Sequence, residues 1–165
     1  MVDASINLAV SPEDVAAVRE LMAAYGQYLQ ANPHGARICL EDYEQELAGL
    51  PAPYLALLLA RADGAAAGCA ALKAVRRPAM ASERACEMKR LWVGLEFRGL
   101  GLGRRLVEEA IAWAKQQQYD ALYLDTVPAA FPEASRLYQA LGFVEIERYN
   151  DNLVKNVAFF RLKLS

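Results

Sequence analysis

Three glycines at alternate positions, Gly99, Gly101 and Gly103, are the feature of this sequence that most constrains its fold. They lie in the stretch EMKRLWVGLEFRGLGLGRRLVEEA, between an apolar run that ends at Val93 and an amphipathic run that begins at Leu102. Apolar residues of the second run recur every three or four positions, as on one face of a helix. The pattern predicts a strand, a glycine-rich loop and a helix in direct succession.

A glycine-rich loop that leads into a helix is suited to binding an anion. The amide groups of the first helical turn lack internal partners and carry about half a positive charge from the helix dipole. Glycine permits positive φ and has no Cβ atom that would hold a ligand away from the backbone. Arg98, Arg104 and Arg105 add positive charge on both sides of the glycines. The loop is therefore predicted to bind a pyrophosphate group.

Two familiar phosphate-binding loops do not fit this spacing. A P-loop requires GxxxxGK followed by serine or threonine, and the sequence has no lysine in that place. A dinucleotide-binding fingerprint requires GxGxxG close to the first strand of its domain. Counted from Gly99, the third glycine position is occupied by Arg104, and the stretch lies far from the first expected strand.

Composition favours a globular protein. A chain of 165 residues can bury a large core, and 55% apolar and 23% charged residues are typical of globular domains. A net charge of −2 argues against nucleic acid as a partner. The longest apolar run, residues 51–60, is too short to span a membrane, and the first residues lack a signal-peptide pattern. We therefore expect a cytoplasmic protein with no membrane partner.

Histidine and cysteine usage predicts no metal site. The single histidine, His34, follows Pro33 in an expected loop and has no evident partner for zinc binding or for a Ser/His/Asp triad. The three cysteines, Cys39, Cys69 and Cys86, lack the spacing of metal ligands. We expect them to be reduced and mostly buried.

The hydrophobic pattern predicts alternating strands and helices, with residues 1–165 forming one domain. A capping serine at Ser11, followed by a proline and two acids, predicts the start of the first helix. Asp63 and Gly64 predict the turn of a hairpin within residues 53–75. Further helices are expected at residues 40–50, 102–118 and 133–141, and further strands at residues 6–10, 85–93, 121–126, 143–148 and 157–164. This order predicts an α/β fold with a mixed, mostly antiparallel sheet of about six or seven strands flanked by helices on both faces.

Two motifs carry a resemblance to a known family. The loop sequence RGLGLG fits the pattern (Q/R)xxGx(G/A), and EASRLYQALGF, about thirty residues later, fits AxxLYxxxGF. With these motifs the chain resembles the GCN5-related N-acetyltransferase (GNAT) superfamily, from its first helix to its last strand. The resemblance implies a single-domain GNAT fold. It also implies transfer of an acetyl group from acetyl-CoA to a primary amine by direct attack in a ternary complex.

The resemblance implies how acetyl-CoA is held. The main chain of the loop would wrap the pyrophosphate, and the preceding strand would pair with the pantetheine arm. The Leu91 amide would donate to the thioester carbonyl and stabilise the oxyanion that develops there. Many relatives have an asparagine where this chain has Phe131, so the contact on this side is expected to be apolar or made by the backbone, with Ser135 as the polar alternative. The cofactor-binding residues implied are Leu91, Trp92, Val93, Arg98, Gly99, Leu100, Gly101, Leu102, Gly103, Arg104 and Ser135.

Two residues match the catalytic positions of relatives. Tyr138 matches the tyrosine that protonates the departing CoA thiolate in many members. Glu87, six residues before Val93, matches the glutamate that serves histone-acetylating members as general base. Only a neutral amine attacks, so a carboxylate that removes its proton assists the reaction. Each residue also has a structural alternative: Tyr138 as a helix residue packed on the sheet, and Glu87 as a solvated strand residue or the ion-pair partner of Lys89 or Arg90.

The acceptor amine is left open by the sequence. We expect it to be bound by the first two helices, the loop at residues 30–40 and the segment 148–157. An acidic cluster in the second helix is interpreted either as steering for a cationic amine or as a solvated helix face; its members are Glu41, Asp42, Glu44 and Glu46. A non-catalytic acyl-CoA-binding sensor or interaction module is the alternative function, and a nucleotide-dependent enzyme is a more remote one. An exposed final strand would also support a homodimer.

Overall fold

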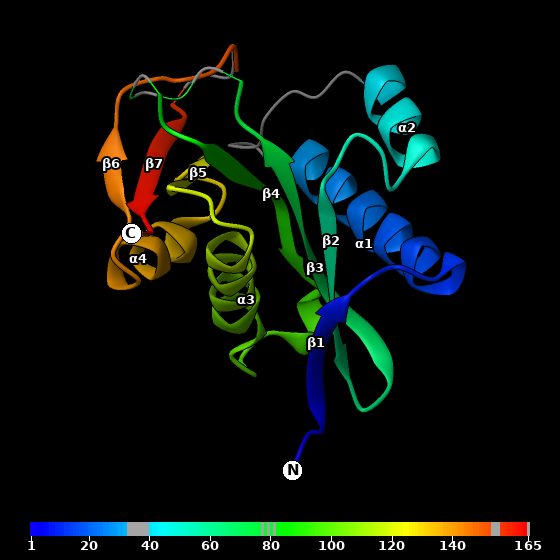
Figure 1. The fold of residues 1–165 in the computed structure, drawn as a ribbon. Helices are drawn as coiled ribbons and strands as arrows, with labels where there is room; N and C mark the ends of the chain where they lie inside the picture. The colour runs from blue at the N-terminus through cyan, green and yellow to red at the C-terminus, as the bar shows by residue number, and fades with distance from the viewer. Residues whose placement is uncertain (33–39, 77, 79, 81, 153–155, 165) are drawn as a thin grey trace.

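Seven strands form one open sheet at the centre of the molecule (Figure 1). The computed structural model describes residues 1–32, 40–76, 78, 80, 82–152 and 156–164. The strand order is β1-β2-β3-β4-β5-β7-β6, with β4 and β5 parallel and the other neighbours antiparallel. The predicted mixed, mostly antiparallel sheet is confirmed. Its strands are β1 (Ala4–Leu8), β2 (Ala56–Ala62), β3 (Ala65–Ala74), β4 (Ala85–Val93), β5 (Ala121–Thr126), β6 (Val144–Ile146) and β7 (Ala158–Lys163).

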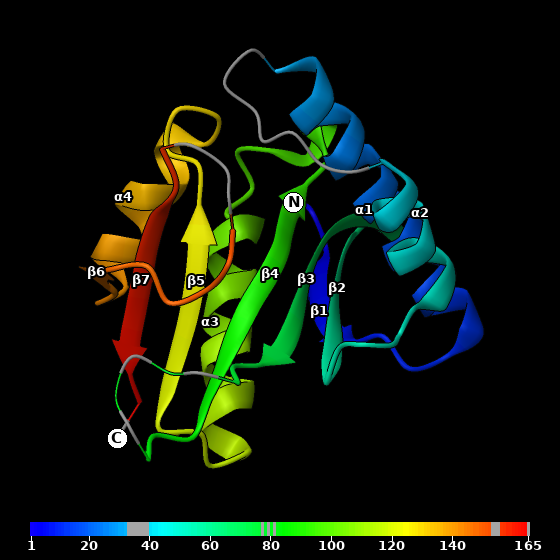
Figure 2. The same cartoon turned by 90° about the horizontal axis from the view of Figure 1, so that it is seen from above.

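Helices cover both faces of the sheet, as predicted (Figures 1 and 2). Successive residues of a central strand point to opposite faces of the sheet, so they pack alternately against the two helical layers. Leu57 and Leu59 of β2 pack with α1, whereas Leu58 packs with α3. One layer consists of α1 (Pro12–Ala31) and α2 (Leu40–Gly49), and the other of α3 (Leu102–Gln116) and α4 (Pro132–Ala140); a short 3-10 helix, η1 (Leu95–Phe97), precedes α3.

Local sequence signals set several boundaries where they were predicted. The Ser11 hydroxyl accepts a hydrogen bond from the Asp14 amide at 3.1 Å and caps α1. Asp63 and Gly64 join β2 to β3 with φ of 48° and 84°, the positive values that such a two-residue turn requires. Gly142, which follows α4, has a φ of 97°. At these places one or two residues decide the backbone conformation.

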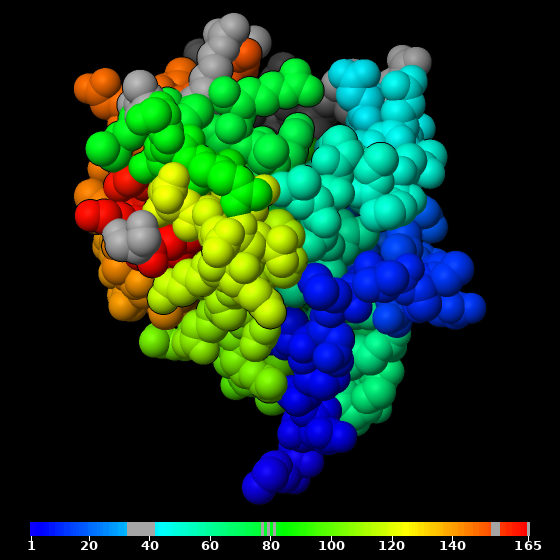
Figure 3. Space-filling view, in the orientation of Figure 1, coloured from blue at the N-terminus to red at the C-terminus, as the bar shows by residue number. Residues whose placement is uncertain are grey.

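The first strand starts two residues earlier than expected, at Ala4 instead of residue 6. Its register is set by β2, because the Asp63 amide donates to the Asp3 carbonyl at 2.7 Å and extends the pairing towards the N-terminus. Figure 3 shows this end of β1 projecting from the body of the molecule.

The final strand is not an exposed edge, so that expectation was wrong. β7 lies between β5 and β6, and the edges of the sheet are β1 and β6. The first three residues of β7, Ala158 to Phe160, are all buried, whereas Val144 of β6 is 66% exposed. A strand that buries consecutive apolar residues takes an inner position.

Two of the three cysteines are buried free thiols, as predicted. Burial raises the pKa of Cys69 and of Cys86 to about 12. Cys39 and His34 lie outside the described residues. None of the described helices has the length and apolar character needed to cross a membrane.

The parallel pairing of β4 and β5 is short. It covers three positions and ends at Glu87 and Tyr123. β4 then continues to Val93 and β5 to Thr126, without pairing to each other. Figure 2 shows the two strands side by side at one end and apart at the other. The sheet is therefore open along the second half of β4.

Gly26 allows α2 to approach α1. A Cβ atom at this position would lie 2.5 Å from Cε2 of Tyr43. The Tyr43 ring is buried, and its hydroxyl donates to the Met22 carbonyl at 2.5 Å. A larger residue at position 26 would have to displace this ring.

We expect Gly26→Ala to destabilise the protein by about 1–3 kcal/mol, because overpacking outweighs the gain in helix propensity of about 1 kcal/mol. Gly49→Ala is the matched control, since a Cβ at this helical glycine meets nothing within 4 Å. Urea unfolding of both variants measures the difference. Equal free energies of unfolding for Gly26→Ala and the wild type would contradict the packing described.

Candidate active site

A cleft of about 1120 Å³ lies where β4 and β5 separate. β4 lines it continuously from Glu87 to Val93, and β5 lines it from Leu124. The remaining walls come from α1, Lys73 of β3, the loops before α3 and α4, α4 itself and residues 150–152. Within the described ranges, no three His, Cys, Asp or Glu side chains are grouped so as to hold a metal ion.

The glycine-rich loop lies at one end of this cleft. Gly101 caps α3 with a φ of 75°, and Gly99 has a φ of 86°. A Cβ atom at either glycine would meet nothing within 4 Å, so the main chain is accessible from the cleft. The loop precedes a helix of 15 residues, whose first amides point towards its N-terminus. This geometry fits a pyrophosphate group.

The arginines near the loop differ in their contacts. The Arg98 guanidinium donates from Nε to the Val93 carbonyl at 3.2 Å and lies 5.1 Å over the Trp92 ring. Arg104 instead pairs with Glu108 at 2.8 Å on the exposed side of α3. Of the loop residues predicted to bind the cofactor, the cleft is lined by Arg98, Gly99, Gly101, Leu102 and Gly103, and not by Leu100 or Arg104.

Aromatic side chains form the wall next to Phe131. The Phe131 ring lies 6.0 Å from the ring of Tyr25 and 5.4 Å from that of Tyr28. The Tyr28 hydroxyl donates to the Ala130 carbonyl at 3.1 Å and joins α1 to the loop before α4. Ser135 does not line the cleft, and its buried hydroxyl has no hydrogen-bond partner among the described residues. This wall is therefore apolar where relatives are expected to have an asparagine.

Tyr138 lines the cleft from α4. Its side chain is 4% exposed and packs against Phe143 and Phe160, with ring centroids 5.7 and 6.0 Å away. Burial, with smaller contributions from Tyr25 and Asp125, raises the pKa of Tyr138 above its ordinary value. The phenol therefore keeps its proton throughout the neutral range. Tyr138 therefore packs on the sheet and also lines the cleft.

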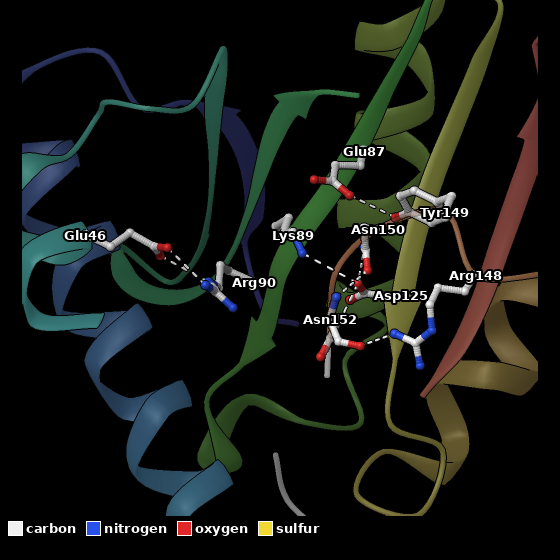
Figure 4. Close-up of polar contacts among 9 residues, drawn as sticks. All are labelled: Glu46, Glu87, Lys89, Arg90, Asp125, Arg148, Tyr149, Asn150 and Asn152. Atoms are coloured by element: carbon white, nitrogen blue, oxygen red, sulfur yellow. Dashed lines mark hydrogen bonds and ion pairs between the residues drawn. The ribbon is translucent and has the colours of Figure 1, made fainter. Parts of the chain in front are cut away.

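Glu87 lines the cleft from β4 and is only 8% exposed, so it is not a solvated strand residue. Its Oε2 accepts a hydrogen bond from the Tyr149 hydroxyl at 2.8 Å (Figure 4). The expected alternative partners are engaged elsewhere, since Lys89 pairs with Asp125 and Arg90 with Glu46. Both structural alternatives for Glu87 were therefore wrong. Its other oxygen, Oε1, has no hydrogen-bond partner within the described part of the chain.

Asp125 is a further carboxylate that lines the cleft, besides Glu87, Glu133 and Asp151, and sequence reasoning missed it. Its Oδ2 accepts from the side-chain amides of Asn150 and Asn152 at 2.7 and 3.4 Å and lies 3.6 Å from the Lys89 ammonium (Figure 4). These contacts hold the segment after β6 against β5. The available signal was a charged residue at the end of a buried apolar strand, a place where charge is rarely left without a function.

Of the acidic cluster in α2, the side chains of Asp42, Glu44 and Glu46 are described by the structure, whereas that of Glu41 lies outside the described residues. Asp42 and Glu44 are exposed, whereas Glu46 forms two hydrogen bonds with the Arg90 guanidinium at 3.0 and 3.1 Å. Steering of a cationic amine is not the role of Glu46, because Arg90 neutralises its charge. The exposed members agree with the interpretation as a solvated helix face.

Comparisons with known proteins identify the family. The sequence profile of the Acetyltransferase (GNAT) family matches residues 16–143. An uncharacterized N-acetyltransferase of Schizosaccharomyces pombe is 34% identical over 166 residues, which cover 98% of this chain and 95% of that protein. An uncharacterized N-acetyltransferase of Dictyostelium discoideum is 48% identical over 80 residues, which cover 48% of this chain and 37% of that protein.

Solved structures share the fold. An acetyltransferase of the GNAT family from Staphylococcus aureus Mu50 superposes with a TM-score of 0.73 at 22% identity, covering 98% of this chain and 100% of that one. The yncA protein of Salmonella typhimurium, solved with its cofactor acetyl-CoA, superposes with a TM-score of 0.73 at 20% identity, covering 98% of this chain and 94% of that one. The profile match and the similarity to the Schizosaccharomyces pombe protein establish the family. The chain belongs to the GNAT family of acetyltransferases.

Proposed function

We propose that this protein, as one catalytic domain, transfers an acetyl group from acetyl-CoA to a primary amine by direct attack in a ternary complex. The observation that carries the proposal is the arrangement along one cleft. An open glycine loop at a helix N-terminus and the buried side chains of Tyr138 and Glu87 all line this cleft. The N-acetyltransferase relatives and the acetyl-CoA in the yncA structure support the same assignment.

The glycine loop would hold the diphosphate of acetyl-CoA. The main chain at Gly99 and Gly101 is accessible from the cleft, because a Cβ atom at either position would meet nothing within 4 Å. The edge of β4 beyond Glu87, at Leu91 to Val93, is not paired to β5 and offers hydrogen-bonding groups to the pantetheine arm. The aromatic wall at Phe131 replaces the polar contact expected from relatives.

Glu87 and Tyr138 would each carry out one of the two proton transfers of the reaction. Glu87 would accept the proton of the attacking amine, because its Oε1 has no hydrogen-bond partner among the described residues and it lies in the cleft. The Leu91 amide would stabilise the negative charge that develops on the thioester carbonyl. Tyr138 would donate its proton to the sulfur of the departing thiolate, a role that suits a phenol held in its protonated form.

A thiol-release assay with acetyl-CoA and a panel of primary amines tests the proposed function. We expect release that depends on both the enzyme and at least one amine. Calorimetry on the same preparation measures acetyl-CoA binding independently. Tight binding of acetyl-CoA without thiol release from any amine would indicate a sensor or interaction module instead.

Gly101→Val should weaken acetyl-CoA binding by about tenfold or more, because a branched side chain would lie against the diphosphate. Gly64→Val is the matched control: both glycines have positive φ, and a Cβ at either meets nothing within 4 Å, but Gly64 lies in the β2–β3 turn. Calorimetric titration of both variants separates backbone strain from loss of contact. Equal affinities in the two variants would remove the loop from the binding site.

Tyr138→Phe should lower kcat by about a hundredfold or more while acetyl-CoA affinity changes little, because only the proton donor is lost. Tyr119→Phe is the control, since Tyr119 stacks on Trp113 and does not line the cleft. Steady-state kinetics and calorimetry measure the two quantities. An unchanged kcat in Tyr138→Phe would exclude the phenol as the acid.

Glu87→Gln should move the activity to higher pH, because the reaction would then depend on amine that is already neutral. Glu83→Gln is the matched control: the Glu83 carboxylate also accepts a tyrosine hydroxyl, that of Tyr123 at 2.5 Å, but it does not line the cleft. The pH dependence of kcat/KM is measured for both. Superimposable profiles for Glu87→Gln and the wild type would exclude Glu87 as the base.

A further inference from the structure

Arg90 is a charged residue of β4 that the proposed chemistry does not use. Its φ of 59° lies in the left-handed region, which is rare for a residue other than glycine. The register of β3 and β4 shifts at the same place, because Cys69 faces Trp92 and Ala71 faces Lys89. Two residues of β4 therefore oppose one residue of β3, which is a β-bulge.

The bulge determines what the end of β4 presents to the cleft. Met88, before the bulge, belongs to the core beneath α3, and Leu91, after it, packs against the same core. In a regular strand, residues three positions apart point to opposite faces. The extra residue therefore inverts the orientation of residues 91–93, including their main-chain groups, relative to a regular strand.

The side chain of Arg90 anchors the bulge to α2. Its Nε and Nη2 donate to the two oxygens of Glu46 at 3.1 and 3.0 Å, a bidentate arrangement that fixes the guanidinium plane (Figure 4). The guanidinium also lies 5.2 Å over the Tyr43 ring, and the Cys69 thiol donates to the Arg90 carbonyl at 3.6 Å. The Arg90 and Glu46 side chains are only 21% and 20% exposed.

Both members of this pair stay charged. Burial would lower the pKa of Arg90, but the hydrogen bonds of Glu46 and the charge interactions with Tyr54, Glu46 and Tyr25 together outweigh it, and the pKa is raised. Burial would raise the pKa of Glu46, but the hydrogen bonds and charge of Arg90 outweigh it, and the pKa is lowered. The contact is therefore an ion pair throughout the neutral range.

We propose that Arg90 is a positioning residue: through its pair with Glu46 it holds the β4 bulge, and thereby fixes the Leu91 main chain that would donate to the thioester carbonyl of bound acetyl-CoA. The inference rests on the proposed function, because it assigns the pair to the geometry of acetyl transfer. The Arg90–Glu46 pair also connects α2, which is expected to help bind the acceptor, with β4, whose main chain would bind the thioester end of acetyl-CoA. Arg90 itself touches no reacting atom in this account.

Two substitutions remove the pair in different ways. Arg90→Gly removes the side chain but permits the positive φ, so added backbone strain cannot explain its effect. Glu46→Gln keeps the shape of the partner and removes its charge. Arg61→Gln is the matched control, because Arg61 of β2 pairs with Asp14 of α1 at 2.9 Å, and neither residue lines the cleft.

We expect Arg90→Gly and Glu46→Gln each to lower kcat by about tenfold to a hundredfold, because misplacement by about 1 Å is costly in catalysis. The Kd for acetyl-CoA should change less than kcat, since the glycine loop, which would hold the diphosphate, is untouched and only the contact of the pantetheine arm with β4 is disturbed. The double variant should be no slower than the slower single variant, because both remove one contact. Arg61→Gln should retain wild-type kcat. Steady-state kinetics, calorimetry and thermal melting of all four variants measure these effects.

Wild-type kcat in folded Arg90→Gly or Glu46→Gln would overturn the inference and leave the proposed function intact. A loss of acetyl-CoA affinity equal to the loss of kcat would also overturn it, since it would show a binding role. If Arg90→Gly does not fold, kcat and Kd are measured for Arg90→Lys and Glu46→Gln instead. Lysine keeps the charge and loses the bidentate geometry, so an unchanged kcat in Arg90→Lys would contradict the proposal. A wild-type protein that releases no thiol with any amine would overturn both proposals.

Discussion

The end of the parallel pairing between β4 and β5 is the constraint on which the site depends. Beyond Glu87 and Tyr123 the strands diverge, although each remains paired on its other side, β4 to β3 and β5 to β7. The outer pairings keep both strands extended, so an unpaired edge of β4 is held open next to a polar end of β5. A GNAT enzyme can use such an edge because a ligand with hydrogen-bonding groups is able to take the place of the missing strand.

Much of the fold was predictable because short signals act locally. The Ser11 cap, the Asp63–Gly64 turn and the loop glycines each fix their backbone through neighbouring residues, and the structure has them where the sequence placed them. Apolar periodicity likewise predicted the order of helices and strands. The two family motifs then identified the loop before α3 and the tyrosine of α4, both of which line the cleft.

The partners inside the site were not predictable in the same way. Tyr149 and Glu87 are 62 positions apart in the chain, and Arg90 and Glu46 are 44 apart, so these contacts exist only through the sheet order and the packing of α2. The bulge at Arg90 has no local signal, because an arginine within a strand pattern predicts neither positive φ nor a change of face. The inner position of β7 similarly depends on competition between two strands for burial.

Hydrogen–deuterium exchange with and without acetyl-CoA tests most directly whether the open edge of β4 and the glycine loop form the cofactor site. We expect acetyl-CoA to slow exchange of the amides at residues 91–93 and 99–104, while amides of β1, which does not line the cleft, exchange at an unchanged rate. Saturation with acetyl-CoA that leaves exchange at residues 91–93 and 99–104 unaltered would contradict this expectation.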